Sequence, residues 1–385
     1  MITTLAVENY RSLNALVMPL APLTVVTGAN GVGKSNLYGA LSLLSAAARG
    51  QVVSALAMQG GLSQVMWAGP AKISRAMERR EVPVQGGPRK GPSRIRLGFS
   101  GDDFAYSIEL GMPVPAQSLF NLDPVIKRES IWHGARYRKA SVLVERNGAV
   151  LKRRNKRQLE TVTESLAMHD SLFDHAGDPT SVPEVFSLRE SIRAWRFYAN
   201  FRTDADAPAR RTMVATRTPV LNHDGCDLAA ALQTIMEVGD SEGLADCVDD
   251  AFPGSRLEIQ PDSAHRLEAV LWQPGLLRGL RCSEWSDGTL RYMLLIAALF
   301  TPRPPPLMIL NEPETSLHPE LIEPLARLIK RASEHSQLWV ISHASALVRA
   351  LEASDNTLSH QLEKNLGRTQ IAGLHALDVP AWRWQ

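Results

Sequence analysis

The chain has 385 residues, enough for two or three domain-sized units or for one domain with a large insertion. Apolar residues make up 44% of it and charged residues 21%, as in ordinary globular proteins, and a net charge of +2 argues against a surface that is basic throughout. The chain has three cysteines and no C-x-x-C pair, which argues against a zinc site and a disulfide framework. No apolar run approaches about 18 residues, which argues against a membrane span. The sequence also shows no secretory signal, so a cytoplasmic location is expected.

The spacing of apolar residues predicts the secondary structure along the chain. Strands are expected at residues 2–7, 13–17, 23–27, 95–99, 104–110, 140–145, 150–151, 257–259, 267–272, 307–310 and 338–341. Helices are expected at residues 36–49, 156–173, 185–194, 228–237, 241–252 and 289–300, after Pro319 and after His343. Loops are expected at residues 82–92 and 203–219. The pair Asn147-Gly148 suits a type I′ turn and predicts a hairpin around it.

The order of these elements predicts an α/β fold. Strands alternate with helices near both ends of the chain, which indicates a mostly parallel core sheet, and the hairpins indicate an antiparallel β subdomain beside it. The expected segments are residues 1–154, a largely helical insertion at 155–280, and 281–385. Prolines exclude a long coiled coil from the middle segment; they stand at positions 179, 183, 208, 219, 253 and 261.

The segment from Gly28 to Ser35 has the spacing G-x-x-x-x-G-K-[ST] of a phosphate-binding loop. It lies between an expected strand and an expected helix, which is the context that such a loop needs. Its glycines let consecutive N–H groups converge on phosphate oxygens, and the helix N-terminus adds partial positive charge. Lys34 is expected to reach the β- and γ-phosphates, and the Ser35 hydroxyl to ligate Mg²⁺. The chain is therefore predicted to bind a nucleoside triphosphate.

Polar residues follow the last two expected strands. Asn311 and Glu312 follow the strand at 307–310, and the Glu312 carboxylate is expected to orient or deprotonate the attacking water. His343 follows the strand at 338–341 and is expected to hydrogen-bond the γ-phosphate or that water. A solvated acid and a loop histidine without a role are the alternatives.

A short polar motif, Ser286-Asp287-Gly288-Thr289, precedes the helix expected at residues 289–300. Its serine or aspartate can cap the helix by accepting hydrogen bonds from first-turn N–H groups. A helix that begins with such small residues can also bind a phosphate at its N-terminus. Capping the helix and binding a phosphate are compatible roles for this motif.

The order of these motifs resembles the ABC-type ATPase heads of the RecF and SMC class, and more closely the RecF-like ATPases related to the OLD family. Residues 5–12 are similar to the first strand and arginine turn of that class, with Arg11 as the arginine. Residues 28–36 are similar to its G-x-N-G-x-G-K-S-N loop. The further matches are residues 286–288 to the signature motif, 307–312 to Walker B, 314–319 to the D-loop and His343 to the switch histidine.

The resemblance implies a P-loop ATPase that binds ATP and Mg²⁺ between two head-to-head copies. The nucleotide contacts that it implies from one copy are Arg11, Asn30, Gly31, Gly33, Lys34, Ser35 and Asn36. Ser286 and Gly288 would reach the γ-phosphate bound to the other copy. Glu312, His343 and Lys34 would be catalytic.

The chain departs from the class at Asn311, where Walker B usually ends in an aspartate. An amide oxygen can still contact Mg²⁺ but brings no charge, so weaker metal binding and slower hydrolysis are expected. Ser35 and Asn311 are the first two expected metal contacts. Gln64 is the expected third, with Gln51, or no glutamine, as alternatives.

Basic residues form local clusters, and aromatic residues stand among some of them. The basic members are Arg89, Lys90, Arg94, Arg96, Lys152, Arg153, Arg154, Lys156, Arg157, Arg196, Arg202, Arg210 and Arg211, and the aromatic ones are Trp195, Phe197, Tyr198 and Phe201. Such a surface can hold a phosphate backbone and stack bases. The alternative is a solvated face over a packed aromatic core.

Two functions stay open. One is a dimerising RecF-like ATPase that acts as a switch or clamp in DNA repair or in defence against phage and other foreign DNA. The other is a slowly hydrolysing, nucleotide-dependent scaffold that regulates a separate effector protein. About forty residues follow His343, too few for the nuclease domain of OLD proteins, so an effector is expected on another polypeptide.

Overall fold

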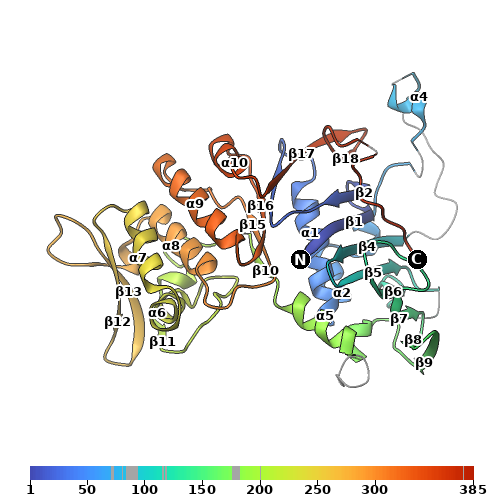
Figure 1. Cartoon of the computed structure of the whole chain (residues 1–385), viewed down its shortest axis with the longest axis horizontal. Coiled ribbons are helices and arrows are strands. Elements are labelled where there is room, and N and C mark those ends of the chain that lie inside the picture. Colours follow the sequence, from blue (N-terminus) through green and yellow to red (C-terminus); the bar gives the residue numbers. More distant parts are fainter. Residues whose placement is uncertain are drawn as a thin grey trace. The chain divides into compact units, whose positions relative to one another are not determined.

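The computed structural model describes residues 1–70, 73–79, 81–83, 94–114, 117, 119–175, 183–199, 201–375 and 377–385 (Figure 1). These residues form two compact units. Unit 1 holds Met1–Ala21, Gly28–Trp195 and His360–Gln385, and unit 2 holds Pro22–Thr27 and Arg196–Ser359. This division differs from the three segments expected from the sequence, because residues 155–195 and 360–385 belong to unit 1 and one strand from the start of the chain belongs to unit 2.

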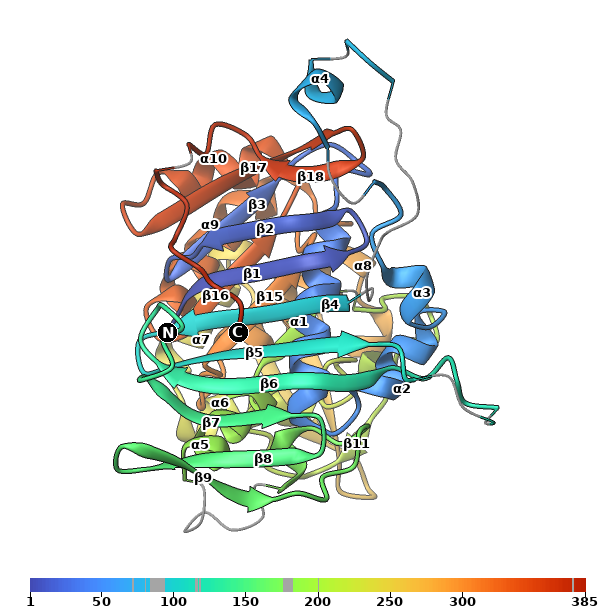
Figure 2. The same ribbon diagram turned by 90° about the vertical axis from the view of Figure 1, so that its right-hand side faces the viewer.

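An eight-stranded antiparallel sheet dominates unit 1, in the order β2-β1-β4-β5-β6-β7-β8-β9, and Figure 2 shows it face-on with α1 behind it. Its strands are β1 Ile2–Tyr10, β2 Leu13–Pro19, β4 Arg94–Gly101, β5 Phe104–Gly111, β6 Val125–His133, β7 Val142–Asn147, β8 Val150–Asn155 and β9 Gln158–Thr163. In β4, Leu97 and Phe99 are buried whereas Arg94 and Arg96 are partly exposed, so one face of the sheet packs on the core and the other meets solvent.

The other elements described in unit 1 are helices and the hairpin of β17 and β18. The helices are α1 Lys34–Ala48, α2 Val52–Met58, α3 Leu62–Val65, α4 Arg75–Glu78, the 3-10 turn η1 Leu172–His175 and α5 Pro183–Arg193. The hairpin consists of β17 Thr357–Asn365 and β18 Arg368–Ile371, and its paired residues, 362–371, lie in unit 1. The helix expected at 36–49 thus begins two residues earlier, at the lysine of the phosphate loop.

The helix expected at residues 156–173 is wrong. Gln158–Thr163 forms β9, which pairs with β8 across a tight turn, and only η1 follows. Three consecutive β-branched residues, at positions 161–163, favour the pleated sheet, and Lys156 takes a positive φ of 53° in the turn. The charged residues around this turn obscure the sequence pattern of a strand, and the spacing of apolar residues therefore predicts a helix instead.

The hairpin of β7 and β8 is confirmed, but its turn differs from the expected one. Asn147 pairs with Val150, so the two turn residues are Gly148 and Ala149. Of these two only Gly148 has a positive φ, of 58°, whereas a type I′ turn needs two such residues.

A buried ion pair joins β6 to β7. Nη1 of Arg146 lies 3.3 Å from Oε2 of Glu129, and both side chains are 0% exposed. Glu129 also accepts hydrogen bonds from Tyr106, Ser171 and the N–H of Leu172, and Arg146 donates to the carbonyls of Gly148, Ala167 and Asp170. Burial raises the pKa of Glu129, and Arg146 and the hydrogen bonds oppose that rise. The network fixes the segment after β9 on the sheet.

Removing one member of this pair should strongly destabilise the protein. Arg146→Met leaves a buried carboxylate without its counter-charge, and we expect the free energy of unfolding to fall by about 3–5 kcal/mol. The control is Arg327→Met, which removes the partner of the exposed carboxylate of Asp250 (2.7 Å) and should cost less than about 1 kcal/mol. Denaturant titrations followed by circular dichroism measure both losses, and equal losses would contradict the assignment.

Four parallel strands form the core of unit 2, in the order β10-β15-β16-β3. They are β10 Arg196–Tyr198, β15 Leu307–Asn311, β16 Gln337–Ile341 and β3 Leu23–Thr27. Nearly all residues of β15, β16 and β3 are buried, as expected for parallel strands with both faces covered. The register pairs Asn311 with Ile341 and Ile341 with Val26, so these three strands end at one edge of the sheet.

Helices and a small antiparallel sheet complete unit 2. The helices are α6 Leu228–Val238, α7 Ser241–Ala251, α8 Asp287–Leu299, α9 Ile322–Ser333 and α10 Ser345–Glu352, with the 3-10 turns η2 Pro208–Arg210, η3 Cys282–Glu284 and η4 Pro319–Leu321. The small sheet consists of β11 Met213–Val214, β12 Arg256–Pro261, β13 Arg266–Trp272 and β14 Leu280–Arg281. Buried residues of α6, α8 and α9 share one apolar core with β15 and β16.

Candidate functional site

The phosphate loop begins directly after β3 and leads into α1. Gly28, Gly31 and Gly33 have φ values of 143°, 80° and 114°, which side chains rarely tolerate. At Gly28 a Cβ would also lie 2.7 Å from the carbonyl oxygen of Leu362. The loop therefore needs glycine at these positions for its backbone path.

Lys34 folds back over the loop. Its ammonium group is buried and donates to the carbonyl oxygens of Gly28 and, at 3.3 Å, Ala29. Ser35 is exposed in the first turn of α1. A cation held over loop carbonyls, beside an exposed hydroxyl at a helix start, is the arrangement that phosphate loops use for a triphosphate and its metal.

Of the other expected contacts of unit 1, Asn30 lies in this loop and Asn36 at the start of α1, whereas Arg11 lies in the turn between β1 and β2. Asn30 is exposed at its tip, and Asn36 donates from Nδ2 to the hydroxyl of Ser12 at 2.7 Å. The guanidinium carbon of Arg11 lies 5.7 Å from the ring centre of Tyr10, and Nη2 donates to Gln59.

Gln64, the expected third metal contact, is exposed on the short helix α3. Its amide oxygen lies beside Gly60 in the turn before that helix. Gln51, the alternative, immediately precedes α2. The assignment of the metal-linked glutamine therefore stays a prediction.

Two of the expected catalytic residues of unit 2 lie together. The Nδ1 atom of His343 is 3.4 Å from Oε1 of Glu312, and both side chains are partly exposed. Glu312 has a φ of 50°, and its N–H donates to the carbonyl of Ile341 at 2.7 Å. Positive φ in a residue with a long side chain is strained and is common at functional sites. Asn311, the last residue of β15, precedes this kink.

Glu314 lies in the D-loop and makes a contact between two loops of unit 2 that the sequence does not predict. Its side chain is buried, and Oε1 accepts from the Ser342 hydroxyl at 2.6 Å and from the N–H groups of His343 and Ala344 at 3.3 Å. This carboxylate therefore joins the loop after β15 to the loop that carries His343. Burial lowers the pKa of Arg291 in α8, and the carboxylates of Glu314 and Glu312 oppose that fall.

The signature residues start α8. The Ser286 hydroxyl accepts from the N–H of Thr289 at 3.1 Å, as an N-cap. A Cβ at Gly288 would lie 3.0 Å from the carbonyl oxygen of Ser316, so the D-loop packs closely on this helix start. The start of α8 and the D-loop line a cavity of about 550 Å³. The residues around it are 251–252, 286, 288–289 and 316–321.

Arg210 holds the segment before α8 in place, although the sequence analysis grouped it with the nucleic-acid candidates. Its side chain is 9% exposed, and Nη2 lies 3.0 Å from Oδ1 of Asp287. Nη1 donates to the carbonyls of Cys282, Ser283 and Trp285 at 3.1, 3.3 and 2.8 Å. One arginine therefore satisfies three carbonyls just before the signature serine.

Removing this arginine should loosen the signature segment. Arg210→Met leaves three carbonyls without their charged donor, and we expect the free energy of unfolding to fall by about 2–3 kcal/mol. The neighbouring Arg211 is exposed, so Arg211→Met serves as the control and should change stability by no more than about 0.5 kcal/mol. Both are measured by denaturant unfolding; a neutral Arg210→Met would show that the contacts contribute nothing net.

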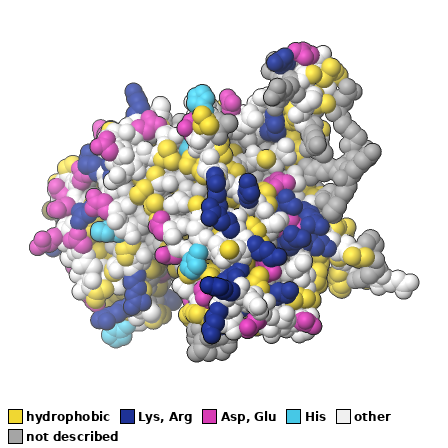
Figure 3. Space-filling view, turned by 45° about the vertical axis from the view of Figure 1, so that its right-hand side comes forward, with side chains coloured by type: hydrophobic (Ala, Val, Ile, Leu, Met, Phe, Trp, Pro, Cys, Tyr) yellow, Lys and Arg dark blue, Asp and Glu magenta, His cyan; other side chains and the backbone are white. Residues whose placement is uncertain are grey.

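The basic clusters divide between paired and surface residues. Arg94 and Arg96 pair with Glu109, and Arg154 donates to the carbonyl of Lys139 at 2.6 Å. Figure 3 shows Lys and Arg side chains gathered on one face of unit 1, and Arg96, Arg128 and Lys152 share the solvent face of the antiparallel sheet by register. Arg89 and Lys90 lie outside the described residues.

Three of the four aromatic residues near these clusters are packed inside the protein. Trp195 packs on Phe99, with ring centres 5.4 Å apart, and Tyr198 packs on Phe201 at 5.3 Å. Trp195, Tyr198 and Phe201 are buried, so they are not available to stack on bases. For these three residues the packed-core alternative is confirmed.

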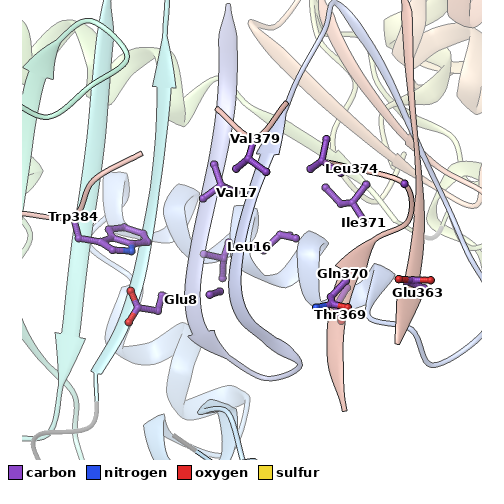
Figure 4. A pocket seen from close by; sticks show the side chains of 13 residues that line it. Glu8, Leu16, Val17, Glu363, Thr369, Gln370, Ile371, Leu374, Val379 and Trp384 are labelled. Carbon is purple, nitrogen blue, oxygen red and sulfur yellow. The ribbon is translucent and has the colours of Figure 1, made fainter. Parts of the chain in front are cut away.

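Besides the cavity in unit 2, a cavity of about 450 Å³ lies in unit 1, between the sheet and the last part of the chain (Figure 4). Its lining comes from β1, β2, β17, β18 and residues 373, 374, 379 and 384; the labelled apolar members are Leu16, Val17, Ile371, Leu374, Val379 and Trp384. Thr369 of β18 lies at the wall of this cavity.

A family profile described as "AAA domain, putative AbiEii toxin, Type IV TA system" matches residues 23–349. The chain belongs to this family. A search of curated proteins found no match. Among solved structures, the chain is similar to an SMC head bound to the C-winged helix domain of ScpA (14% identity, 98% of each chain, TM-score 0.51). It is also similar to the SMC head domain from Thermotoga maritima (15% identity, 97% of this chain and 99% of that chain, TM-score 0.50).

At these identities the solved structures show the fold alone. They confirm the predicted α/β class, a P-loop ATPase fold of the SMC-head type, and the resemblance to RecF and SMC heads. In the part of the chain that the structure describes, no helix is both long and apolar enough to cross a membrane. Nor do the described residues hold a cluster of three His, Cys, Asp or Glu side chains with the geometry of a metal site.

Proposed function

We propose that this AAA-family chain binds ATP and hydrolyses it, with Glu312 as the catalytic base. The observation that supports this most is the common edge of three parallel strands in unit 2. Gly28 directly follows β3, Glu312 directly follows β15, and His343 follows β16 after one intervening residue. Because the strands are parallel and in register, the chain leaves the sheet at the same edge each time.

The side chains of the phosphate loop and those that follow the strands each have a proposed role. Lys34 and the N–H groups at the start of α1 would bind the β- and γ-phosphates and balance their charge. Glu312 would accept a proton from the attacking water, and His343 would orient that carboxylate and hydrogen-bond the γ-phosphate. Glu314 would keep His343 in position through the loop that it binds. Asn30 and Arg11 would add nucleotide contacts from the loop tip and the β1–β2 turn.

The donor set at this site fits Mg²⁺. Ser35 offers a hydroxyl oxygen and Asn311 an amide oxygen, and Mg²⁺ is usually held by one or two protein oxygens besides phosphate and water. When bound, the ion would neutralise the phosphates and polarise the γ-phosphoryl group. Gln64 is the proposed third contact, through its amide oxygen.

We also propose that two copies close on the nucleotide. Ser286 is exposed at the start of α8, beside the cavity that the D-loop lines, and Gly288 adds no side chain to this helix start. These features suit a helix start that meets the γ-phosphate bound to a second copy.

The signature serine provides the test of this shared site. Ser286→Arg should leave ATP affinity within about twofold, abolish ATP-driven dimerisation and lower turnover at least about 100-fold, because its bulk blocks the approach of the second copy. The matched variant Glu312→Gln should lose turnover to a similar extent yet keep the ATP-bound dimer. Light scattering and phosphate release measure the two properties; unchanged turnover in Ser286→Arg would refute the shared site.

Asn311 sets the expected metal affinity. Asn311→Asp restores a carboxylate at the end of β15, and we expect it to lower the Mg²⁺ concentration needed for half-maximal turnover by roughly tenfold and to raise turnover. Steady-state ATPase assays over a Mg²⁺ series measure this. The control is Asn365→Asp, which adds the same charge at the end of β17; an equal response in both variants would point to net charge rather than to the metal site.

We place this ATPase in DNA repair or in defence against phage and other foreign DNA, as a switch or clamp. The family description, with its toxin of a toxin–antitoxin system, supports the defence role, and the basic residues on the sheet face of unit 1 support a DNA contact. The second candidate is a slow, nucleotide-dependent scaffold for an effector protein, supported by the uncharged Asn311. A solved SMC head carries a protein partner, which fits that candidate. ATP turnover with and without duplex DNA separates the two.

A further inference from the structure

The hairpin of β17 and β18 braces the phosphate loop from outside the motif. Thr369 is buried, and its hydroxyl donates to the carbonyl of Val32 at 2.6 Å. Lys364 of β17 donates from Nζ to the carbonyl of Gly31 at 3.2 Å. All of these residues belong to unit 1. Two consecutive carbonyls of the loop are therefore held by side chains more than 300 residues further along the chain.

A directed chain of hydrogen bonds ends at Val32. The single hydroxyl proton of Thr369 goes to the Val32 carbonyl, since a carbonyl can only accept. The Ser12 hydroxyl, 2.6 Å from Oγ1 of Thr369, must then donate to it, and Asn36 donates to Ser12 at 2.7 Å. Helix α1, the β1–β2 turn and β18 are joined at the loop by this one chain.

The held carbonyls determine where the loop N–H groups point. In a trans peptide the C=O and N–H bonds point in opposite directions. When Thr369 holds the carbonyl of Val32, the N–H of Gly33 faces away from β18; when Lys364 holds the carbonyl of Gly31, the N–H of Val32 faces across the loop. There it lies 3.5 Å from the carbonyl of Ala29. Oriented N–H groups are what such a loop offers to phosphate oxygens.

The fit between the two partners is close. A Cβ placed on Gly33 would lie 2.2 Å from Oγ1 of Thr369 and 2.8 Å from the hydroxyl oxygen of Ser12. Glycine at position 33 therefore allows not only a positive φ but also direct contact with this hydroxyl pair. The contact is specific to Thr369, because it is the hydroxyl and not the methyl group that faces the loop.

We propose that Thr369 is a positioning residue for triphosphate binding: it fixes the Val32–Gly33 peptide so that the Gly33 N–H points at the bound phosphate. Ser12 supports it as the next member of the chain, and Lys364 holds the preceding peptide. This inference rests on the proposed ATP binding and adds a residue to that site.

The test compares variants of the full chain that differ by one hydroxyl or one methyl group. Thr369→Val removes the hydroxyl at nearly constant volume and should weaken binding of a fluorescent ATP analogue and of inorganic tripolyphosphate equally, by roughly fivefold to tenfold. Thr369→Ser keeps the hydroxyl and should restore binding to within about twofold of the wild type. The equal effect on tripolyphosphate assigns the loss to the phosphate cradle rather than to the base.

A matched control exists on the same hairpin. Thr357 also donates its hydroxyl to a carbonyl, that of Leu351, at 2.9 Å, so Thr357→Val removes the same kind of hydrogen bond away from the loop. It should leave both affinities unchanged. Ser12→Ala, the second variant, should weaken tripolyphosphate binding less than Thr369→Val does, and the double variant should lose less than the sum, because both act through one chain.

The outcomes separate the two proposals. If Lys34→Ala abolishes tripolyphosphate binding while Thr369→Val and Ser12→Ala bind as the wild type does, the role of Thr369 is refuted and ATP binding stands. A lower midpoint of thermal unfolding in Thr369→Val with unchanged affinity also refutes it, since that is a structural role only. If the wild type binds neither probe, both proposals fail.

Discussion

The register of β15, β16 and β3 is the constraint on which the site depends. The three strands are parallel and buried, and a shift of any one by a single residue would turn its side chains from one face of the sheet to the other. The pairing of Asn311 with Ile341 and of Ile341 with Val26 sets where each strand stops. Apolar packing several residues away thus determines where the polar residues that follow each strand lie. The positions of the polar side chains at this edge therefore depend on the apolar core.

Charged side chains of both signs lie close together at this edge of the sheet. Glu312 and Glu314 bring two carboxylates close to each other, and Arg291 of α8 lies in their field. An aspartate in place of Asn311 would add a third carboxylate at a strand end that already carries a strained, positive-φ residue. The amide at this position avoids that added repulsion.

The sequence predicts the elements whose signals are local. The phosphate loop, β3 and the alternating strands β4 and β5 follow from spacing and turn residues, and β3 is found at the expected residues. It does not predict β9, because charged residues around a tight turn mask three β-branched ones. The roles of Glu314, Arg210 and Thr369 are also missed, since each depends on partners brought by the fold from 28, 77 and 337 residues away. No pattern within a window of a few residues contains that information.

The hydrogen bond that braces the phosphate loop joins two residues that are made far apart in time during synthesis. Gly28 to Ser35 emerge from the ribosome early, but Thr369 is made 337 residues after the carbonyl that it holds. Domains generally fold from the N-terminal side as the chain grows. A nascent chain that stops short of β18 therefore has the complete motif without the hydroxyl that holds the Val32 carbonyl. Under the proposed role of Thr369, nucleotide would stabilise such a chain less than one that includes β18.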